Sequence, residues 1–224
     1  MKVSYSHLVS QIKENPSIEM ISESLFQLGH EHEIDGDILN MELTPNRGDC
    51  LSINGLLRDL SAFYTVDFKK KIYSEKIEKL ELDFENLSQN TCPKISFLKI
   101  EIDNIPSEYN QYLDDYFMKL NLNKNNFFTD ISNYLSYETG QPTHCYDASK
   151  INGKLVLQES EINKEFLTLL DKKITLTSKN SFFSIDDEVV NLAGIVGGKS
   201  TACTLETKTV LVECAFFEPE AIIG

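Results

Sequence analysis

The stretch ETGQPTHCYD, residues Glu138–Asp147, brings several chemically capable side chains into one turn. His144 is one of only four histidines in the chain. It could act as a general base, bind a ligand or pack in the core, and for an isolated histidine packing is the most frequent role. Cys145 is its neighbour, but adjacency does not create a Cys–His dyad, and no serine or cysteine lies in a recognisable nucleophile motif. Because no second histidine is near in the sequence, we expect no metal site here.

A single carboxylate interrupts the apolar run VLVECAFF, residues Val210–Phe217. The run predicts a central strand, and a bare carboxylate is costly to bury unless it is paired or hydrogen-bonded. The pattern leaves two interpretations of Glu213 open. Its side chain either faces solvent or a basic neighbour, or it forms the polar floor of a pocket.

The segment VNLAGIVGG, residues Val190–Gly198, predicts a strand that ends at Gly197–Gly198. Glycines at this place would let a ligand approach backbone N–H groups closely. An ordinary hairpin or turn is the more frequent explanation of a lone Gly-Gly pair. The segment is not a phosphate-binding P-loop, because a Gly-Lys-Ser/Thr sequence with an earlier glycine at the required spacing is missing.

The composition limits how the chain could bind nucleic acid. The 224 residues carry a formal net charge of −14, and 41% of them are hydrophobic, which is enough to fill a core. A domain that binds RNA mainly through phosphates presents a basic face. Any contact of this acidic chain with RNA must therefore be local or supported by another subunit.

The five cysteines are odd in number and include no C-x-x-C pair. This argues against a disulfide framework and a cysteine-rich zinc site, and it fits a reducing compartment. The N-terminal residues lack the apolar core of a signal peptide, and no apolar run reaches membrane-spanning length. We therefore expect a soluble, cytoplasmic protein with no membrane partner.

Apolar spacing predicts helices in the N-terminal part of the chain. In Ser17–Leu28, the residues Ile18, Ile21 and Leu25 mark one helix face, and Gly29 would end the helix. The other elements expected here are a helix over Ser6–Ile12, a strand over Ile38–Leu43, a turn over Thr44–Asp49, and a following helix with Asp49 as its N-cap.

Strands dominate the sequence after a Lys- and Glu-rich stretch, Lys69–Lys79, which is the best candidate for a domain boundary. Helices first and many strands later favour the α+β class. The elements expected are helices over Glu108–Leu120 and Asp130–Glu138, and strands over Ile95–Ile102, Lys154–Gln158, Phe166–Leu170, Lys173–Thr177, Ser181–Ile185, Val189–Val196 and Thr209–Phe216.

Four separated motifs occur in the order and spacing of one known family. They are ELTPNRGDCLSINGLLRDLSAFY (Glu42–Tyr64), TDISNYLSYETGQPTHCYD (Thr129–Asp147), LAGIVGG (Leu192–Gly198) and ETKTVLVECAFFEPEAI (Glu206–Ile222). Together they resemble the N-terminal part of the bacterial phenylalanyl-tRNA synthetase beta subunit. The resemblance covers nearly the whole chain and is weakest over Lys70–Pro93.

The resemblance implies two domains. Residues 1–75 would form a small helical N-terminal domain, and residues 76–224 a mixed, strand-rich editing domain of the B3/B4 type, truncated at its C-terminal end. Bacterial relatives usually carry an oligonucleotide-fold insert in the first domain. The continuous segment Gly29–Leu43 leaves no room for that insert.

The family also implies roles for particular residues. Its editing site hydrolyses tyrosine wrongly esterified to phenylalanine tRNA. By position in the motifs, Glu213 corresponds to the carboxylate that binds the tyrosine hydroxyl, and Gly197–Gly198 to backbone contacts beside it. His144 corresponds to a histidine at the ester end, with Asp130 and Asn133 shaping the helix above it. A positioned water would attack the ester, so no protein nucleophile is required.

Partners and cofactors follow from the same resemblance. The 3′ end of tRNA(Phe) would be the substrate, and the catalytic alpha subunit would be a partner through parts not in this segment. The complete ligase would use ATP and magnesium, and we expect no cofactor in this segment.

Three departures keep other functions open. Asn123-Lys124 stands where relatives often have an arginine, the oligonucleotide-fold insert is missing, and the chain ends before a threonine-containing segment of the family's pocket. One alternative is a non-catalytic scaffold module that binds RNA or protein. Another is a stand-alone editing hydrolase, against which the net charge of −14 weighs.

Overall fold

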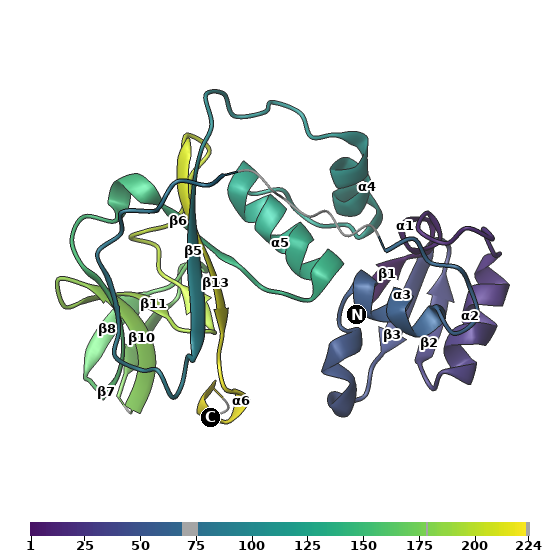
Figure 1. Cartoon of the computed structure of the whole chain (residues 1–224), viewed down its shortest axis with the longest axis horizontal. Coiled ribbons are helices and arrows are strands. Elements are labelled where there is room, and N and C mark those ends of the chain that lie inside the picture. Colours follow the sequence, from purple (N-terminus) through teal and green to yellow (C-terminus); the bar gives the residue numbers. More distant parts are fainter. Residues whose placement is uncertain (69–75, 178, 223–224) are drawn as a thin grey trace. The chain divides into compact units, whose positions relative to one another are not determined.

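The computed structural model describes residues 1–68, 76–177 and 179–222 (Figure 1). The chain forms two compact units that are interleaved in the sequence. The first comprises Met1–Lys76, Pro106–Asn125 and Asn133–Gln141, and the second comprises Ile77–Ile105, Asn126–Ser132 and Pro142–Gly224. Most of the Lys- and Glu-rich stretch, residues 69–75, lies outside the described residues. The division into 1–75 and 76–224 stays a prediction, because the chain returns to the first unit twice.

The first unit combines helices with an antiparallel sheet of strand order β1-β3-β2. The mixture agrees with the predicted α+β class, although the short strands β1 and β2 were not expected. Its elements are β1 (Lys2–Ser4), α1 (Tyr5–Val9), α2 (Ile18–Gln27), β2 (Glu31–Asp35), β3 (Ile38–Glu42), η1 (Pro45–Cys50), α3 (Ile53–Leu60), α4 (Gln111–Lys119) and the second half of α5 (Phe127–Thr139).

Helix α2 forms as its sequence predicts. The Ser17 side chain accepts a hydrogen bond from the backbone N–H of Met20 and so caps the helix. Ile21 and Leu25 are fully buried in the core of this unit. Gly29 follows the helix with φ of +81°, a left-handed conformation that ends helices.

Helix α3 begins later than the sequence suggested. The prediction of Asp49 as its N-cap is wrong, because residues Pro45–Cys50 form the short 3-10 helix η1. Ser52 is the N-cap instead, and its hydroxyl accepts a hydrogen bond from Gly55 N at 3.0 Å. Asp49 is therefore free to pair with arginine side chains.

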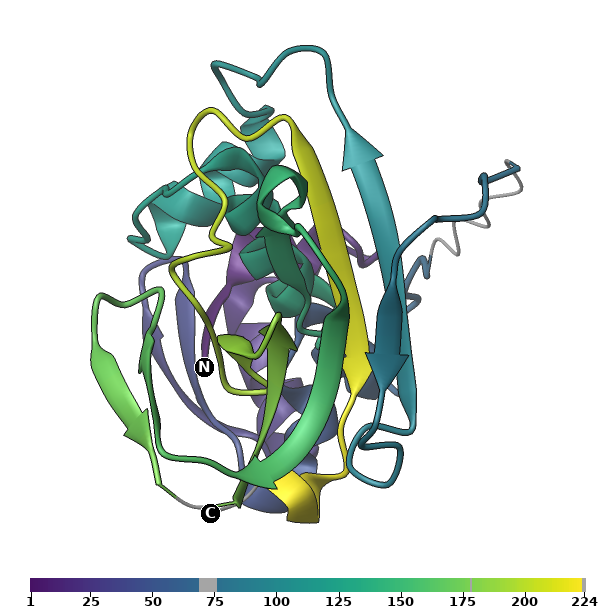
Figure 2. The ribbon, with the colours of Figure 1, turned by 90° about the vertical axis from the view of Figure 1, so that its left-hand side faces the viewer.

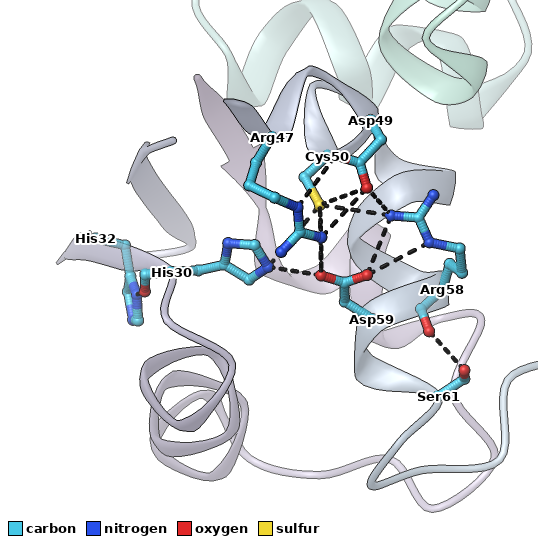
Figure 3. Close-up of polar contacts among 8 residues, drawn as sticks. All are labelled: His30, His32, Arg47, Asp49, Cys50, Arg58, Asp59 and Ser61. Carbon is cyan, nitrogen blue, oxygen red and sulfur yellow. Dashed lines mark hydrogen bonds and ion pairs between the residues drawn. The ribbon is translucent and has the colours of Figure 1, made fainter. Parts of the chain in front are cut away.

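A charged cluster fastens η1 to α3 (Figure 3). Asp59 on α3 accepts hydrogen bonds from Arg47, from Arg58 at 3.1 Å and from His30 at 2.9 Å. Asp49 pairs with the same two arginines. The side chain of Asp59 is 13% exposed and that of Asp49 is 44% exposed, so Asp59 is the half-buried centre of the cluster.

The second unit is built mainly from three sheets. Their strand orders are β12-β11-β10-β7-β4, β5-β13-β6 and β8-β9. The elements are β4 (Phe84–Asn86), β5 (Lys94–Glu101), the first half of α5, β6 (His144–Asp147), η2 (Ala148–Lys150), β7 (Leu155–Glu161), β8 (Lys164–Leu167), β9 (Lys173–Leu176), β10 (Lys179–Ile185), β11 (Glu188–Leu192), β12 (Val196–Gly197), β13 (Thr209–Phe216) and α6 (Pro219–Ile222).

Strand β13 is the centre of its sheet, as the apolar run predicted. It pairs antiparallel with β5 on one side and β6 on the other, and Figure 2 shows it running beside β5. The expected strand over Val189–Val196 is interrupted at Gly194, whose φ of +72° turns the chain between β11 and β12. This turn brings β12 back alongside β11.

No helix in the described part of the chain is long and apolar enough to cross a membrane.

The charged cluster predicts unequal roles for its two aspartates. We expect Asp59→Asn to lower the free energy of unfolding of the first unit by about 2 kcal/mol, because it leaves partly buried donors without their anion. Asp49→Asn should cost clearly less than Asp59→Asn, because ion pairs of exposed groups contribute little. Urea denaturation followed by NMR of the α3 amides measures both. Equal, small losses would show that the cluster does not stabilise this unit.

Candidate functional site

A cavity of about 220 Å³ lies in the second unit, between the strands β6 and β13 of one sheet and the strands β11 and β12 of another. Its lining includes Thr143, His144, Asn191, Gly197, Glu213 and Phe217. Three of the residues chosen from the sequence, His144, Gly197 and Glu213, thus share one cavity. Their functional roles stay predictions.

Glu213 is buried, with 5% of its surface exposed. This confirms the interpretation in which its carboxylate belongs to a pocket rather than to the surface. Its Oε2 accepts a hydrogen bond from the hydroxyl of Tyr146 at 2.6 Å. Burial raises the pKa of Glu213 to about 7, although the hydrogen bond from Tyr146 opposes this shift. The carboxyl group therefore changes charge near neutral pH.

His144 lies directly opposite Glu213 in the β6–β13 pairing, so the two side chains share one face of the sheet. In the part of the chain that the structure describes, its buried Nε2 has no hydrogen-bond partner. Burial lowers the pKa of His144 to about 4, which keeps the ring neutral. A buried polar atom without a partner is costly, and a ligand or water in the cavity would satisfy it.

The two glycines are needed for close packing within the protein. A Cβ atom on Gly197 would lie 2.1 Å from Cε1 of His144, so any side chain there would displace the imidazole. A Cβ atom on Gly198 would lie 2.4 Å from the carbonyl oxygen of Val190. Gly198 is not among the described residues that line the cavity, and the predicted backbone contacts to a ligand remain a prediction.

The remaining candidates, Asp130 and Asn133, lie on α5. Asp130 is fully buried in the second unit. Asn133 is exposed and belongs to the first unit, where it lines a separate hollow with Ser136. Two α5 residues contact this part of the chain: the Ser132 hydroxyl donates to the carbonyl oxygen of Thr143, just before β6, at 2.8 Å, and the Phe128 carbonyl oxygen accepts from the Cys145 thiol at 3.7 Å.

Two residues of the site were missed by the sequence analysis. The Asn191 side-chain amide donates to the Tyr146 hydroxyl at 2.7 Å, and both side chains are buried. Signals for both exist in the sequence. Tyr146 lies two residues after His144, so on a strand both face the same side, and Asn191 is a lone amide in an apolar run like that of Glu213.

Asp147, the last residue of the opening motif, has a structural role. Its carboxylate accepts hydrogen bonds from the Ser149 backbone N–H at 3.1 Å and from the Thr207 hydroxyl at 2.8 Å. Burial alone would raise the pKa of Asp147, but these hydrogen bonds lower it below its ordinary value. Asp147 therefore caps η2 and fixes the end of β6.

The site contains the parts for water-mediated chemistry and lacks an activated nucleophile. Burial raises the pKa of the neighbouring Cys145 thiol to about 11, so that sulfur is protonated and unreactive at neutral pH. A neutral imidazole can orient a water molecule or a carbonyl group, and a carboxylate can accept a hydrogen bond from a ligand. The arrangement suits binding and positioning rather than covalent catalysis.

Three potential metal ligands lie together in the first unit, where ligand atoms of His30, Cys50 and Asp59 fall within 4.8 Å of one another. Protein cations already occupy this donor set, because Arg47 Nη2 lies 2.8 Å from Cys50 Sγ and also donates to Asp59. Burial, together with the hydrogen bond to Asp59, raises the pKa of the Cys50 thiol to about 11. We therefore interpret the cluster as a structural charge network.

Comparisons with known proteins agree with the motifs. The family model of the B3/4 domain matches residues 92–224. The phenylalanine–tRNA ligase beta subunit of Wolbachia sp. subsp. Brugia malayi is 29% identical over 96% of this chain and 28% of its own length. That of Ehrlichia canis is 30% identical over 83% of this chain and 24% of its own length.

A solved structure shows the same fold. The crystal structure of an N-terminal fragment of the phenylalanyl-tRNA synthetase beta subunit from Pyrococcus horikoshii matches with a TM-score of 0.50 at 16% identity, over 99% of this chain and 69% of that one. This chain belongs to the B3/4 domain family. The resemblance inferred from the four motifs is thereby confirmed, and the chain spans about a quarter of the length of the curated relatives it matches.

The burial of Glu213 predicts a pH-dependent stability. A carboxyl group whose pKa is about 7 in the folded state and 4.5 ordinarily takes up a proton on folding, so its contribution is lost as pH rises from about 4.5 to 7. We expect Glu213→Gln to stabilise the chain by about 2–3 kcal/mol at pH 8 and by little at pH 5.

Urea denaturation at both pH values measures this difference. The exposed Glu188→Gln serves as a control and should change stability at pH 8 far less than Glu213→Gln does. A Glu213→Gln variant that is no more stable than the parent at pH 8 would show that burying the ionised carboxylate does not destabilise the fold.

Proposed function

We propose that this chain forms the N-terminal part of a phenylalanine–tRNA ligase beta subunit and that its cavity hydrolyses tyrosine from mischarged tRNA(Phe). The observation that carries the proposal is a cavity that buries a hydrogen-bond acceptor, Glu213, beside a neutral histidine whose Nε2 has no partner among the described residues. The imidazole Nε2 has no contact from the described protein atoms, and Glu213 accepts one hydrogen bond, from Tyr146.

Editing explains why a carboxylate would be kept in an apolar strand. A hydrophobic synthetic pocket rejects an added hydroxyl poorly, so a second site must recognise that hydroxyl positively. Tyrosine would donate its phenolic hydrogen to Glu213, whereas phenylalanine would leave the carboxylate oxygen unpaired. Such a lost hydrogen bond costs about 1–3 kcal/mol, which corresponds to roughly 5- to 150-fold discrimination.

His144 would serve the ester end of the substrate. Its neutral ring can hold the attacking water or the ester carbonyl through Nε2, and no covalent intermediate is required. Gly197 supports this role, because its missing side chain gives the imidazole its place. The rate would then come from positioning in a cavity of restricted size.

The whole ligase would supply the other parts of the reaction. The 3′ end of tRNA(Phe) would deliver the ester, and a catalytic alpha subunit would charge the tRNA with ATP and magnesium. Because the chain is acidic, with a net charge of −14, most phosphate contacts would come from other surfaces of the assembly. The expected compartment is the cytoplasm.

A scaffold module is the second candidate, and one observation favours it. The protein's own Tyr146 already donates to Glu213, so a phenol occupies one oxygen of the carboxylate that would recognise tyrosine. In a module that has lost hydrolysis, this hydrogen bond would serve only to satisfy the buried charge. The two functions differ in whether the cavity still admits a ligand.

The test uses the beta subunit that carries this chain, assembled with its alpha partner. We expect Glu213→Ala to slow the deacylation of tyrosyl-tRNA(Phe) and to reduce the preference over phenylalanyl-tRNA(Phe) by at least about fivefold. His144→Ala should slow deacylation while keeping more of the preference, because it acts at the ester end. Deacylation rates of the two aminoacyl-tRNAs give both quantities.

The matched control is Glu188→Ala, an exposed glutamate of the same unit, which should deacylate at the parental rate. If Glu213→Ala and His144→Ala also deacylate tyrosyl-tRNA(Phe) at that rate, this lineage does not edit through these residues. The scaffold function would then replace the editing function.

A further inference from the structure

A directed chain of hydrogen bonds leads into the carboxylate at the floor of the cavity. Asn191 on β11 donates its side-chain N–H to the Tyr146 hydroxyl at 2.7 Å, and Tyr146 on β6 donates its O–H to Oε2 of Glu213 at 2.6 Å. The exposed fractions of the three residues are 4%, 0% and 5%. We call this series of hydrogen bonds, formed by Asn191, Tyr146 and Glu213, the carboxylate relay.

The direction of the relay is fixed by its donors. An amide nitrogen donates but does not accept, and a phenol carries only one hydrogen. Because Asn191 donates to the oxygen of Tyr146, the phenolic hydrogen is available to Glu213. Glu213 is then held as an acceptor. The reverse direction would require both a protonated Glu213 and a rotated Asn191 amide.

The relay leaves one carboxylate oxygen for a ligand. Tyr146 uses Oε2, and among the described residues no other side-chain hydrogen bond reaches this carboxylate. Glu213 lines the cavity, so Oε1 is the oxygen that a bound molecule can contact. At Oε1 an ionised carboxylate presents only lone pairs, so it accepts hydrogen bonds. It repels ligand groups that can themselves act only as acceptors.

The groups around Glu213 make the Tyr146 hydroxyl important for the charge on its carboxylate. Its titratable neighbours are His144 and Tyr146 on β6 and, before β5, Cys92, whose raised thiol pKa reflects burial first and the Glu213 charge second. Burial lowers the pKa of His144 to about 4, so that ring supplies no positive charge at neutral pH. Opposite Glu213 on β5 lies the apolar Phe97.

We propose that Tyr146 and Asn191 set the specificity of the cavity by holding Glu213 as an acceptor, so that it selects aromatic side chains with a para hydrogen-bond donor. The proposal rests on the function proposed above, from which it takes the orientation of the ligand in the cavity. Tyr146 is then a positioning residue that acts through Glu213. A purely structural Tyr146 would affect stability without changing what Glu213 can accept.

The first test measures the charge of Glu213 directly in this chain. Carboxyl carbons of ¹³C-labelled glutamate are titrated by NMR, and Glu213→Gln identifies the signal of Glu213. We expect Tyr146→Phe to raise the pKa of Glu213 by about one unit or more, since it removes a hydrogen bond to the ionised form. Asn191→Leu should give a smaller rise, because Tyr146 loses the donor that orients it.

The matched control is Tyr137→Phe, which removes the same atom from a tyrosine of the first unit and should leave the pKa of Glu213 unchanged. A folded Tyr146→Phe variant with the parental pKa at Glu213 overturns the proposal. If Tyr146→Phe does not fold, the Asn191→Leu variant decides the question by the same criterion.

The second test measures specificity with 4-aminophenylalaninamide, which carries a para donor, against phenylalaninamide. Their affinity ratio, measured by calorimetry, cancels the titration of the shared α-amino group. The parent should favour the amino compound at pH 8 by at least about fivefold. Tyr146→Phe should show a smaller preference at pH 8, because less of Glu213 is ionised, and should regain the parental preference as the pH rises by one to two units.

The two tests separate this proposal from the editing function. If Tyr146→Phe shifts the pKa of Glu213 but the parent binds neither amide, the proposed function and the ligand specificity are refuted. The influence of Tyr146 on the charge of Glu213 then still stands. A preference in Tyr146→Phe that equals the parental one at pH 8 would overturn the relay while leaving editing by Glu213 intact.

Discussion

The burial of one carboxylate between two β-sheets is the constraint on which the site depends. Glu213 is largely withdrawn from solvent, so the protein must either keep it protonated or supply a donor. Tyr146 supplies that donor, and the balance places the pKa of Glu213 at about 7. The site is therefore poised between a neutral and an ionised carboxyl group, and small changes in its surroundings decide which form faces the cavity.

Strand pairing brings the other residues of the site next to Glu213. The register of β6 against β13 places His144 opposite Glu213, and alternation along β6 puts Tyr146 on the same face. The second sheet contributes Asn191 and, through the turn at Gly194, the strand that contains Gly197. Two sheets thus hold in fixed positions the acceptor, its donor and an imidazole nitrogen that has no partner among the described residues, as the proposed hydrolysis by a positioned water would require.

Elements with long runs or regular spacing of apolar residues could be predicted from the sequence, and short or polar elements could not. Strand β13 was expected from its apolar run, whereas β2 has the sequence EHEID, in which Ile34 is the single aliphatic residue. Glu213 was found because a charge in an apolar strand is costly and because the motif matched a family. Its hydrogen bond with Tyr146 depends on the pairing of β6 with β13, and the bond from Asn191 to Tyr146 depends on how two sheets pack across 45 residues of sequence. Neither contact follows from the local sequence pattern. The same holds for Asp59 and its partners in the first unit.

The most direct measurement of the central claim is the affinity of this chain for L-tyrosinamide and L-phenylalaninamide at pH 8, determined by calorimetry under identical conditions. If the buried, ionised carboxylate recognises a phenol, tyrosinamide binds at least about fivefold more tightly, as a hydrogen bond of about 1 kcal/mol requires, and Glu213→Ala removes the difference. Equal affinities, or a tyrosine preference that survives in Glu213→Ala, would contradict the account.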